Sequence, residues 1–142
     1  MKTRVVFSRQ TDEWETPQDL FDKLNDEFHF TLDPCASDEN HKCESYFTKE
    51  DDGLSKKWGG VVFCNPPYSQ IKRWVQKAHE ESERGTTVVL LIPSRTDTRW
   101  FHEYIYGKAE IRFIKGRLHF SGAKYNAPFP SMIVIMRGKK DG

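Results

Sequence analysis

The sequence predicts an α/β fold with a wound, mostly parallel sheet whose last strand is antiparallel. Apolar runs of strand length occur at 61–64, 88–92 and 132–136. The run 88–92 is continuously apolar, as expected of a central parallel strand that is covered on both faces. Segments with apolar residues at helical spacing precede, separate and follow the first two runs. Alternation of strand and helix is typical of doubly wound sheets.

The first predicted helix begins at Thr16, which is suited to an N-cap position, with Pro17 in the first turn. A short strand is then expected at 29–32, and it ends at Asp33-Pro34. The apolar face of the helix has the spacing of one helical side and consists of Leu20, Phe21, Leu24 and Phe28.

Residues 35–60 are polar and interrupted by turn-forming residues, so we expect at most one short strand there, around 45–47. The strand 61–64 comes next. A helix capped by Ser69 follows it and ends near Gly85. The apolar face of this helix consists of Ile71, Trp74, Val75 and Ala78.

After the strand 88–92, we expect a helix that is capped by Thr96 or Asp97 and stopped by Gly107. Its inward residues are Trp100, Phe101, Tyr104 and Ile105. The remaining chain is expected to form, in order, a strand at 110–115, its continuation at 117–120, the loop 121–131 and the antiparallel last strand 132–136.

Length and composition indicate one domain, 1–142, of a protein without a membrane partner. Hydrophobic residues make up 37% of the 142 and charged residues 30%, and the start Met-Lys-Thr-Arg lacks the apolar core of a signal peptide. No stretch approaches the about 18 consecutive apolar residues of a membrane span. The three cysteines form no Cys-x-x-Cys pair, which favours reduced thiols in a cytoplasmic protein. The oligomeric state has no sequence signal.

The net charge of +1 hides an asymmetry between the two halves of the chain. Residues 1–60 carry 8 Lys and Arg against 14 Asp and Glu, whereas residues 61–142 carry 14 against 7. A basic half suits phosphate contacts and an acidic half suits a cationic ligand, although solvated charges also fall unevenly by chance. Arg95, Arg99 and Arg117 are the candidate phosphate contacts beside strand ends, and Lys124 lies in a loop that either reads a nucleic acid or crosses the surface.

The most specific chemistry lies in Asn65-Pro66-Pro67-Tyr68, directly after the strand 61–64. Ligands of open α/β sheets bind at the carboxyl ends of the strands. There the Asn65 amide oxygen and the Pro66 carbonyl offer two acceptors in a turn that two prolines stiffen, and Tyr68 adds a flat ring. Two acceptors on the hydrogens of a ring amine favour the pyramidal form, in which the nitrogen lone pair can attack an activated carbon. A proline turn with a packed tyrosine is the structural alternative.

This tetrapeptide resembles the [D/N/S]-P-P-[Y/F/W] element of amino-methyltransferases, in the variant common among adenine-N6 enzymes. Further segments extend the similarity from about Trp14 to Met136, and the whole pattern is similar to the small phage-type, Dam-like DNA N6-adenine methyltransferases. These segments are Trp14-Glu15-Thr16-Pro17 with Leu20-Phe21, Asp33-Pro34-Cys35-Ala36-Ser37, and the ranges 48–54, 93–102 and 128–131.

The resemblance implies a compact Rossmann-like domain and an adenine-specific DNA methyltransferase that uses S-adenosylmethionine, as found in phage and in restriction-modification systems. It implies that Asn65, Pro66, Pro67 and Tyr68 are catalytic. The cofactor residues that it implies are Trp14, Thr16, Pro17, Asp33, Pro34, Cys35, Asn65 and an acid for the ribose among Glu50, Asp51 and Asp52.

The chain departs from the family pattern at the cofactor loop. After Asp33-Pro34 the sequence Cys35-Ala36-Ser37-Asp38 replaces the glycines that let a backbone approach the cofactor closely. This departure is the best support for a non-catalytic nucleic-acid-binding module. Methylation of a protein glutamine or of an RNA base is the other alternative, because the same acceptor geometry fits any planar amide or amine.

Two further classes find little support. His41-Lys42-Cys43 with Cys35 matches no common zinc spacing, so we expect no metal. No Gly-x-Ser-x-Gly element or visible Ser/His/Asp arrangement points to a hydrolase.

Overall fold

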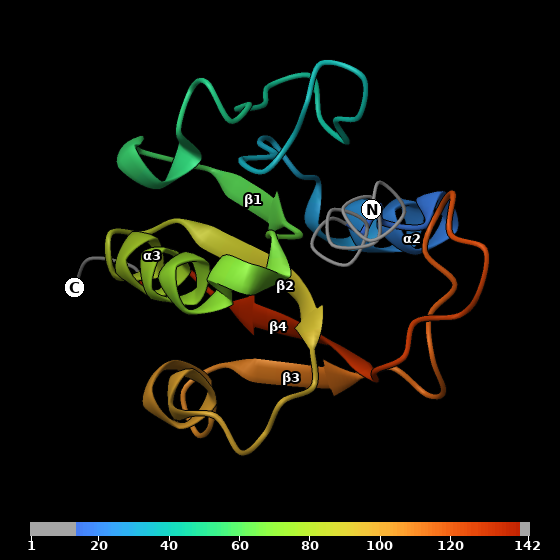
Figure 1. The fold of residues 1–142 in the computed structure, drawn as a ribbon. Coiled ribbons are helices and arrows are strands. Elements are labelled where there is room, and N and C mark those ends of the chain that lie inside the picture. The colour runs from blue at the N-terminus through green and yellow to red at the C-terminus, as the bar shows by residue number, and fades with distance from the viewer. Residues whose placement is uncertain (1–13, 140–142) are drawn as a thin grey trace.

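The computed structural model describes residues 14–139, in which one helix precedes an alternation of strands and helices (Figure 1). The longer elements are α2 (Gln18–Phe28), β1 (Val61–Cys64), α3 (Ile71–Glu83), β2 (Thr87–Pro93), β3 (Glu110–Phe113) and β4 (Ser131–Met136). The short helices are η1 (Gly53–Ser55), η2 (Tyr68–Gln70) and the π-type η3 (Phe101–Ile105).

The four strands form one mixed sheet in the order β1-β2-β4-β3. β1 and β2 are parallel, with Val61 opposite Thr87 and Cys64 opposite Leu90. β4 lies between β2 and β3 and is antiparallel to both. The prediction of an antiparallel last strand is therefore confirmed, but the sheet is mixed rather than mostly parallel: of its three strand pairs, one is parallel and two are antiparallel.

Two single β-bridges extend the sheet beyond β1, where the chain from residue 30 to 47 runs alongside (Figure 1). Leu32 pairs with Val62 and Asp33 pairs with Tyr46, both in parallel. The chain thus passes outward from Asp33 to Tyr46 and then returns to the other side of Asp33 to form β1. This reversal makes a topological switch point between the segment ending at Asp33 and β1, the place where open α/β sheets bind ligands.

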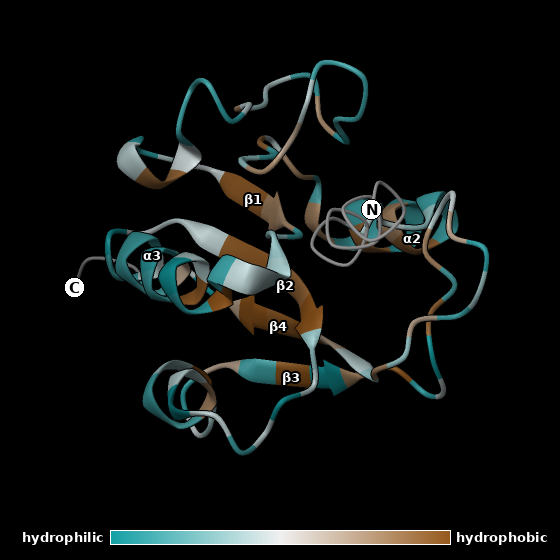
Figure 2. Cartoon of the chain, in the orientation of Figure 1, coloured by the Kyte–Doolittle hydropathy of each residue, from teal (hydrophilic) through white to brown (hydrophobic). Residues whose placement is uncertain are grey.

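The central strands β2 and β4 are buried on both faces because they are apolar along almost their whole length (Figure 2), whereas the edge strand β3 is partly exposed. Alternate residues of β2 face opposite sides, and all of them from Val88 to Ile92 are fully buried. One face packs with α3 and η3, the other with α2 and the segment around Phe120. Continuous apolar strands of this kind are what two covered faces require.

Most predicted elements are confirmed, including the helix face at 71–78 and the lone strand position near Tyr46. Gly107 adopts a left-handed φ of 77° just after η3, as a helix stop should. The predicted strand continuation at 117–120 is wrong, because these residues form no strand and instead lead into the bridge between Ser121 and Glu15.

The predicted helix caps are also wrong. The N-cap position of α2 is Pro17 rather than Thr16, and that of α3 is Gln70 rather than Ser69. Before η3, neither Thr96 nor Asp97 caps: the Thr98 hydroxyl accepts the Phe101 N–H at 3.3 Å. The Thr16 hydroxyl instead accepts a hydrogen bond from the Asn65 side chain. Within residues 14–139, no helix is both long and apolar enough to cross a membrane.

Candidate active site

A cavity of about 1020 Å³ lies at the switch point, against the ends of the segments that stop at Asp33 and Cys64. Six carboxylate side chains and three basic ones line it, which favours a cationic ligand. The predicted site residues in its wall are Trp14, Thr16, Asp33, Pro34, Cys35, Glu50, Asp52, Asn65, Pro66 and Pro67. The other predicted residues near this edge, Pro17, Asp51 and Tyr68, lie outside the wall.

Asn65, the first residue after β1, has its side-chain amide fixed on one side only. Its Nδ2 donates to the Trp14 carbonyl oxygen and, at 2.9 Å, to the Thr16 hydroxyl. A backbone carbonyl can only accept, so this contact determines which end of the amide is nitrogen. The Oδ1 atom is buried and has no hydrogen-bond partner among the described residues. The site therefore presents an oriented acceptor that the protein itself leaves unsatisfied.

Trp14 and Thr16 hold Asn65 in place because both are packed. The Trp14 ring lies 5.3 Å from the rings of Phe120 and Phe129. Thr16 is buried, and its hydroxyl serves Asn65 instead of capping α2, which explains the missing cap. These two residues thus have a positioning role that the sequence motif alone did not reveal.

Asp33 is a buried carboxylate that organises the loop after it. Its Oδ1 accepts the Cys35 N–H at 3.2 Å and its Oδ2 accepts the Lys42 N–H at 3.0 Å. Burial raises the pKa of the carboxyl, and the two backbone hydrogen bonds act in the opposite direction. The loop that lacks glycines is therefore held at both ends by one side chain at the wall of the cavity.

Cys35 and Cys64 bring the two sides of the switch point into contact, with their sulfur atoms 3.5 Å apart. Burial raises the pKa of the Cys35 thiol, and the neighbouring Cys64 adds to the rise. A thiol of raised pKa such as that of Cys35 is unreactive, and the two free cysteines pack the strand ends together.

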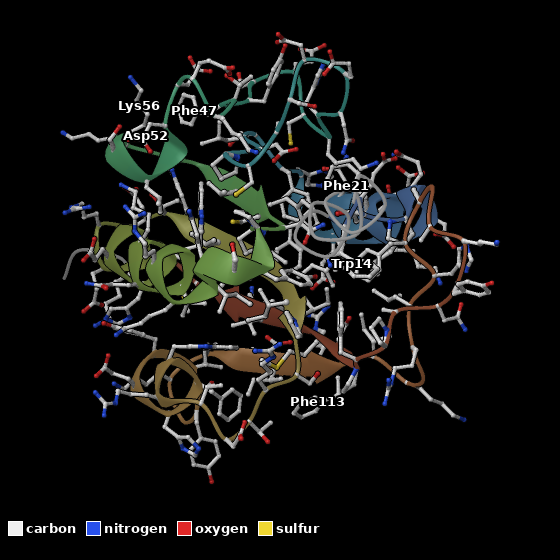
Figure 3. All side chains as sticks on the ribbon, in the orientation of Figure 1. Trp14, Phe21, Phe47, Asp52, Lys56 and Phe113 are labelled. Atoms are coloured by element: carbon white, nitrogen blue, oxygen red, sulfur yellow. The ribbon has the colours of Figure 1, made fainter. Side chains whose placement is uncertain are left out.

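The structure separates the three acids that follow the short strand position at Tyr46. Asp51 accepts hydrogen bonds from the Thr48 backbone and hydroxyl at 2.9 and 3.1 Å, and these bonds lower its pKa. The Asp51 carboxylate therefore stabilises its own turn. Glu50 and Asp52 line the cavity instead. Figure 3 shows Asp52 beside η1 and Trp14 near the start of α2, on either side of β1, so the cavity spans from one to the other.

Gly53, Leu54 and Trp74 also line the cavity, and the sequence analysis missed them as site residues. A side chain on Gly53 would collide with the Pro34 carbonyl oxygen, so only glycine allows the two segments to approach so closely. Trp74 was assigned to the apolar face of α3, where it does lie. Helical spacing cannot distinguish a core tryptophan from one that also borders a cavity.

Tyr68 is half-buried and lies edge-on to Phe129, with ring centroids 5.4 Å apart and an interplanar angle of 71°. Burial raises the pKa of its hydroxyl, which has no hydrogen-bond partner among the described residues. Phe129 belongs to a segment already noted in the sequence pattern, and the structure brings it to the end of the tetrapeptide.

The four predicted DNA contacts, Arg95, Arg99, Arg117 and Lys124, are all exposed. Lys124 lies over the ring of Tyr125 at 5.5 Å, and Tyr125 is 71% exposed. In the part of the chain that the structure describes, no group of three or more His, Cys, Asp or Glu side chains has the arrangement of a metal site.

The chain is similar to one protein family and to relatives from two phages. A model of the family described as DNA N-6-adenine-methyltransferase (Dam) matches residues 4–141. The DNA N-6-adenine-methyltransferase of Escherichia phage T1 is 36% identical over 110 residues, which cover 75% of this chain and 46% of the relative. The protein of the same description from Haemophilus phage HP1 is 34% identical over 107 residues, 72% of this chain and 62% of the relative. The chain thus spans about half to three fifths of the length of these relatives.

Proposed function

Because the chain belongs to the DNA N-6-adenine-methyltransferase (Dam) family, we propose that it transfers a methyl group from S-adenosylmethionine to N6 of adenine in DNA. The observation that carries this proposal is the unsatisfied Oδ1 of Asn65, whose amide orientation is fixed by Trp14 and Thr16 at the wall of the cavity. An amide oxygen held in this way can accept a hydrogen bond from a substrate, and the N6 amine of adenine can donate that hydrogen bond.

Asn65 and Pro66 act on the target amine. The Asn65 Oδ1 accepts one amine hydrogen and the Pro66 carbonyl accepts the other, which favours the pyramidal nitrogen and frees its lone pair. When the nitrogen bonds to carbon, one of its protons must leave. An amide oxygen is not a base, so that proton passes to solvent. Preorganised acceptors of this kind typically contribute about 10²–10³ in rate.

The cofactor residues that we propose fit the cavity wall. Asp33, Pro34 and Cys35 border one part of it, and the carboxylates of Glu50 and Asp52 can accept the ribose hydroxyls. Asp51 is the weaker ribose candidate because Thr48 already occupies it. Trp14, Thr16 and Pro17 support the end nearer to Asn65. When bound, the cofactor supplies an activated methyl carbon.

Tyr68 and the exposed basic residues serve the DNA in this proposal. A paired adenine hides its amine, so the base must leave the duplex and stack, here on Tyr68. Tyr68 contacts Phe129 edge-on, so Phe129 supports the ring on which the base would stack. Arg95, Arg99, Arg117 and Lys124 would contact phosphates, which position the duplex without reading its sequence.

We further propose that residues 1–142 form a single Rossmann-like methyltransferase domain. The switch point between Asp33 and β1 supports this, as does a cavity at the carboxyl ends of the parallel strands. The setting that we propose is the cytoplasm of a bacterial or phage-infected cell, in DNA modification or restriction-modification, since the two relatives are phage proteins.

The test is to incubate the full chain with S-adenosylmethionine that carries a labelled methyl group, in separate reactions with duplex DNA, RNA and a protein mixture. We expect label in DNA, and N6-methyladenine after digestion to nucleosides. The Asn65→Ala variant and DNA already methylated at N6 are the controls. Label in RNA or protein instead would replace the proposed substrate by one of the alternative ones, and DNA binding without label would indicate a non-catalytic module.

A further inference from the structure

Trp74 carries a buried hydrogen-bond donor that has no acceptor. Its side chain is 7% exposed, and its ring stacks on that of Trp58 with centroids 6.1 Å apart and planes inclined by 21°. The two indoles differ in one respect. The Nε1 of Trp58 donates to the Gly53 carbonyl at 2.9 Å, whereas the Nε1 of Trp74 is buried without a partner among the described residues.

A purely structural role does not explain this donor. Buried polar groups are nearly always hydrogen-bonded, and an unsatisfied one costs free energy that a phenylalanine in the same place would avoid. Trp74 also lines the cavity. Because the Nε1 atom is closed to solvent in this structure, an acceptor can reach it only if ligand binding opens the wall of the cavity at Trp74.

The surroundings of Trp74 suit one part of a nucleoside. A Cβ atom on Gly53 would lie 3.2 Å from the ring edge of Trp74, so the indole reaches the residue that follows Asp52. Leu54 adds an apolar side chain to this end of the cavity, and Asp52 and Glu50 add carboxylates. A flat apolar wall suits a purine, and carboxylates suit the hydroxyls of a ribose.

The same surroundings exclude other parts of the cofactor. An indole N–H can only donate, so an ammonium or sulfonium group cannot be its partner. A carboxylate could accept, but the flat apolar wall formed by Trp74 and Leu54 suits a purine better than a charged group. A ring nitrogen of adenine or a ribose oxygen remains.

We infer that the indole N–H of Trp74 donates a hydrogen bond to the adenosine part of S-adenosylmethionine, an inference that rests on the proposed function. Trp74 would then favour cofactors whose adenosine part carries a hydrogen-bond acceptor at this position. Trp58 would only support the indole of Trp74 from behind.

The test compares Trp74→Phe with Trp58→Phe, each of which keeps an aromatic ring and loses an indole N–H. Calorimetry measures the affinity of the full chain for S-adenosylhomocysteine, and thermal unfolding measures the stability without ligand. For Trp74→Phe we expect a Kd raised about three- to tenfold and a smaller loss of melting temperature than for Trp58→Phe, because both variants lose core volume but only Trp58→Phe also leaves a carbonyl without its donor. For Trp58→Phe we expect a larger loss of melting temperature than for Trp74→Phe, because the Gly53 carbonyl loses its donor. The change in Kd should be smaller.

A second measurement uses the wild-type chain, whose four tryptophans give four indole N–H signals in NMR. The Trp74 signal, absent from the spectrum of Trp74→Phe, should move downfield when S-adenosylhomocysteine binds. If that variant does not fold, substitution of the other three tryptophans identifies the signal by elimination. An unmoved signal, or equal affinity of Trp74→Phe and wild type, would overturn the inference alone. A wild type that binds no S-adenosylhomocysteine would overturn the proposed function as well.

Discussion

Asp33 and Asn65 flank the switch point from the two sides, and their side chains are satisfied in opposite ways. Both oxygens of Asp33 accept backbone N–H groups of their own loop. Asn65 uses only its nitrogen within the protein, and its oxygen has no partner among the described residues. Two polar residues at neighbouring strand ends thus have different roles: Asp33 stabilises the loop in the cavity wall, and Asn65 keeps an oxygen that can accept a hydrogen bond from a ligand.

The largest expected effect tests the unsatisfied side of this comparison. Asn65→Ala removes the acceptor, so single-turnover methylation of DNA should fall by about 10²–10³. The affinity for S-adenosylmethionine should change far less. Asn65→Asp keeps an acceptor, so measurable activity should survive. It also turns an oxygen toward the Trp14 carbonyl, so the free energy of unfolding should fall. A wild-type rate for Asn65→Ala would show that the free oxygen has no catalytic role.

The satisfied side is tested by Asp33→Ala, which leaves the N–H groups of Cys35 and Lys42 without their acceptor. We expect the free energy of unfolding to fall by about 2–4 kcal/mol, measured by urea denaturation. Cofactor affinity should fall too, because the loop that lines the cavity loosens. If Asp33→Ala weakened cofactor binding with no loss of stability, Asp33 would be a ligand-binding residue like Asn65 and the contrast would disappear.

Tyr68 resembles Asn65 in having a buried polar atom without a partner, but we propose that it acts through its ring. Tyr68→Ala should lower methylation at least about tenfold, since base stacking contributes about 1–3 kcal/mol. Tyr68→Phe should retain most of the activity and should not lose stability, because it removes an unsatisfied hydroxyl. A Phe variant as slow as the Ala variant would instead assign the hydroxyl to the substrate.

The smallest expected effect is a pH dependence of stability at Asp33, which the Asn65 side chain cannot show because its amide does not titrate. Burial raises its pKa in the folded protein above the unfolded value. Its contribution to stability is therefore fully present below the unfolded pKa, near about 4, and is lost as pH rises through the folded pKa. Across this interval, the free energy of unfolding of wild type, measured by urea denaturation, should fall with rising pH relative to that of Asp33→Asn, whose amide does not titrate. A constant difference would place the Asp33 carboxyl in a solvated environment.

The elements that the sequence predicted well are those in which burial decides the outcome. The run 88–92 became the fully buried centre of β2, and the periodic residues of 71–78 became the packed face of α3. The helix caps were predicted less well because a cap is one hydrogen bond that a tertiary partner can take over. Thr16, which gives its hydroxyl to Asn65 across 49 positions of sequence, is the clearest case.

The sequence by itself determined the α/β class, the position of the tetrapeptide at a strand end and the family, because apolar periodicity and local motifs are written in consecutive residues. Only the tertiary structure decided which polar atoms are left unsatisfied. It joined Asn65 to Trp14 and to the Thr16 hydroxyl, and it buried the indole N–H of Trp74 at the cavity wall. Hydrogen-bond satisfaction depends on neighbours that the fold brings from distant parts of the chain, and no local pattern encodes them.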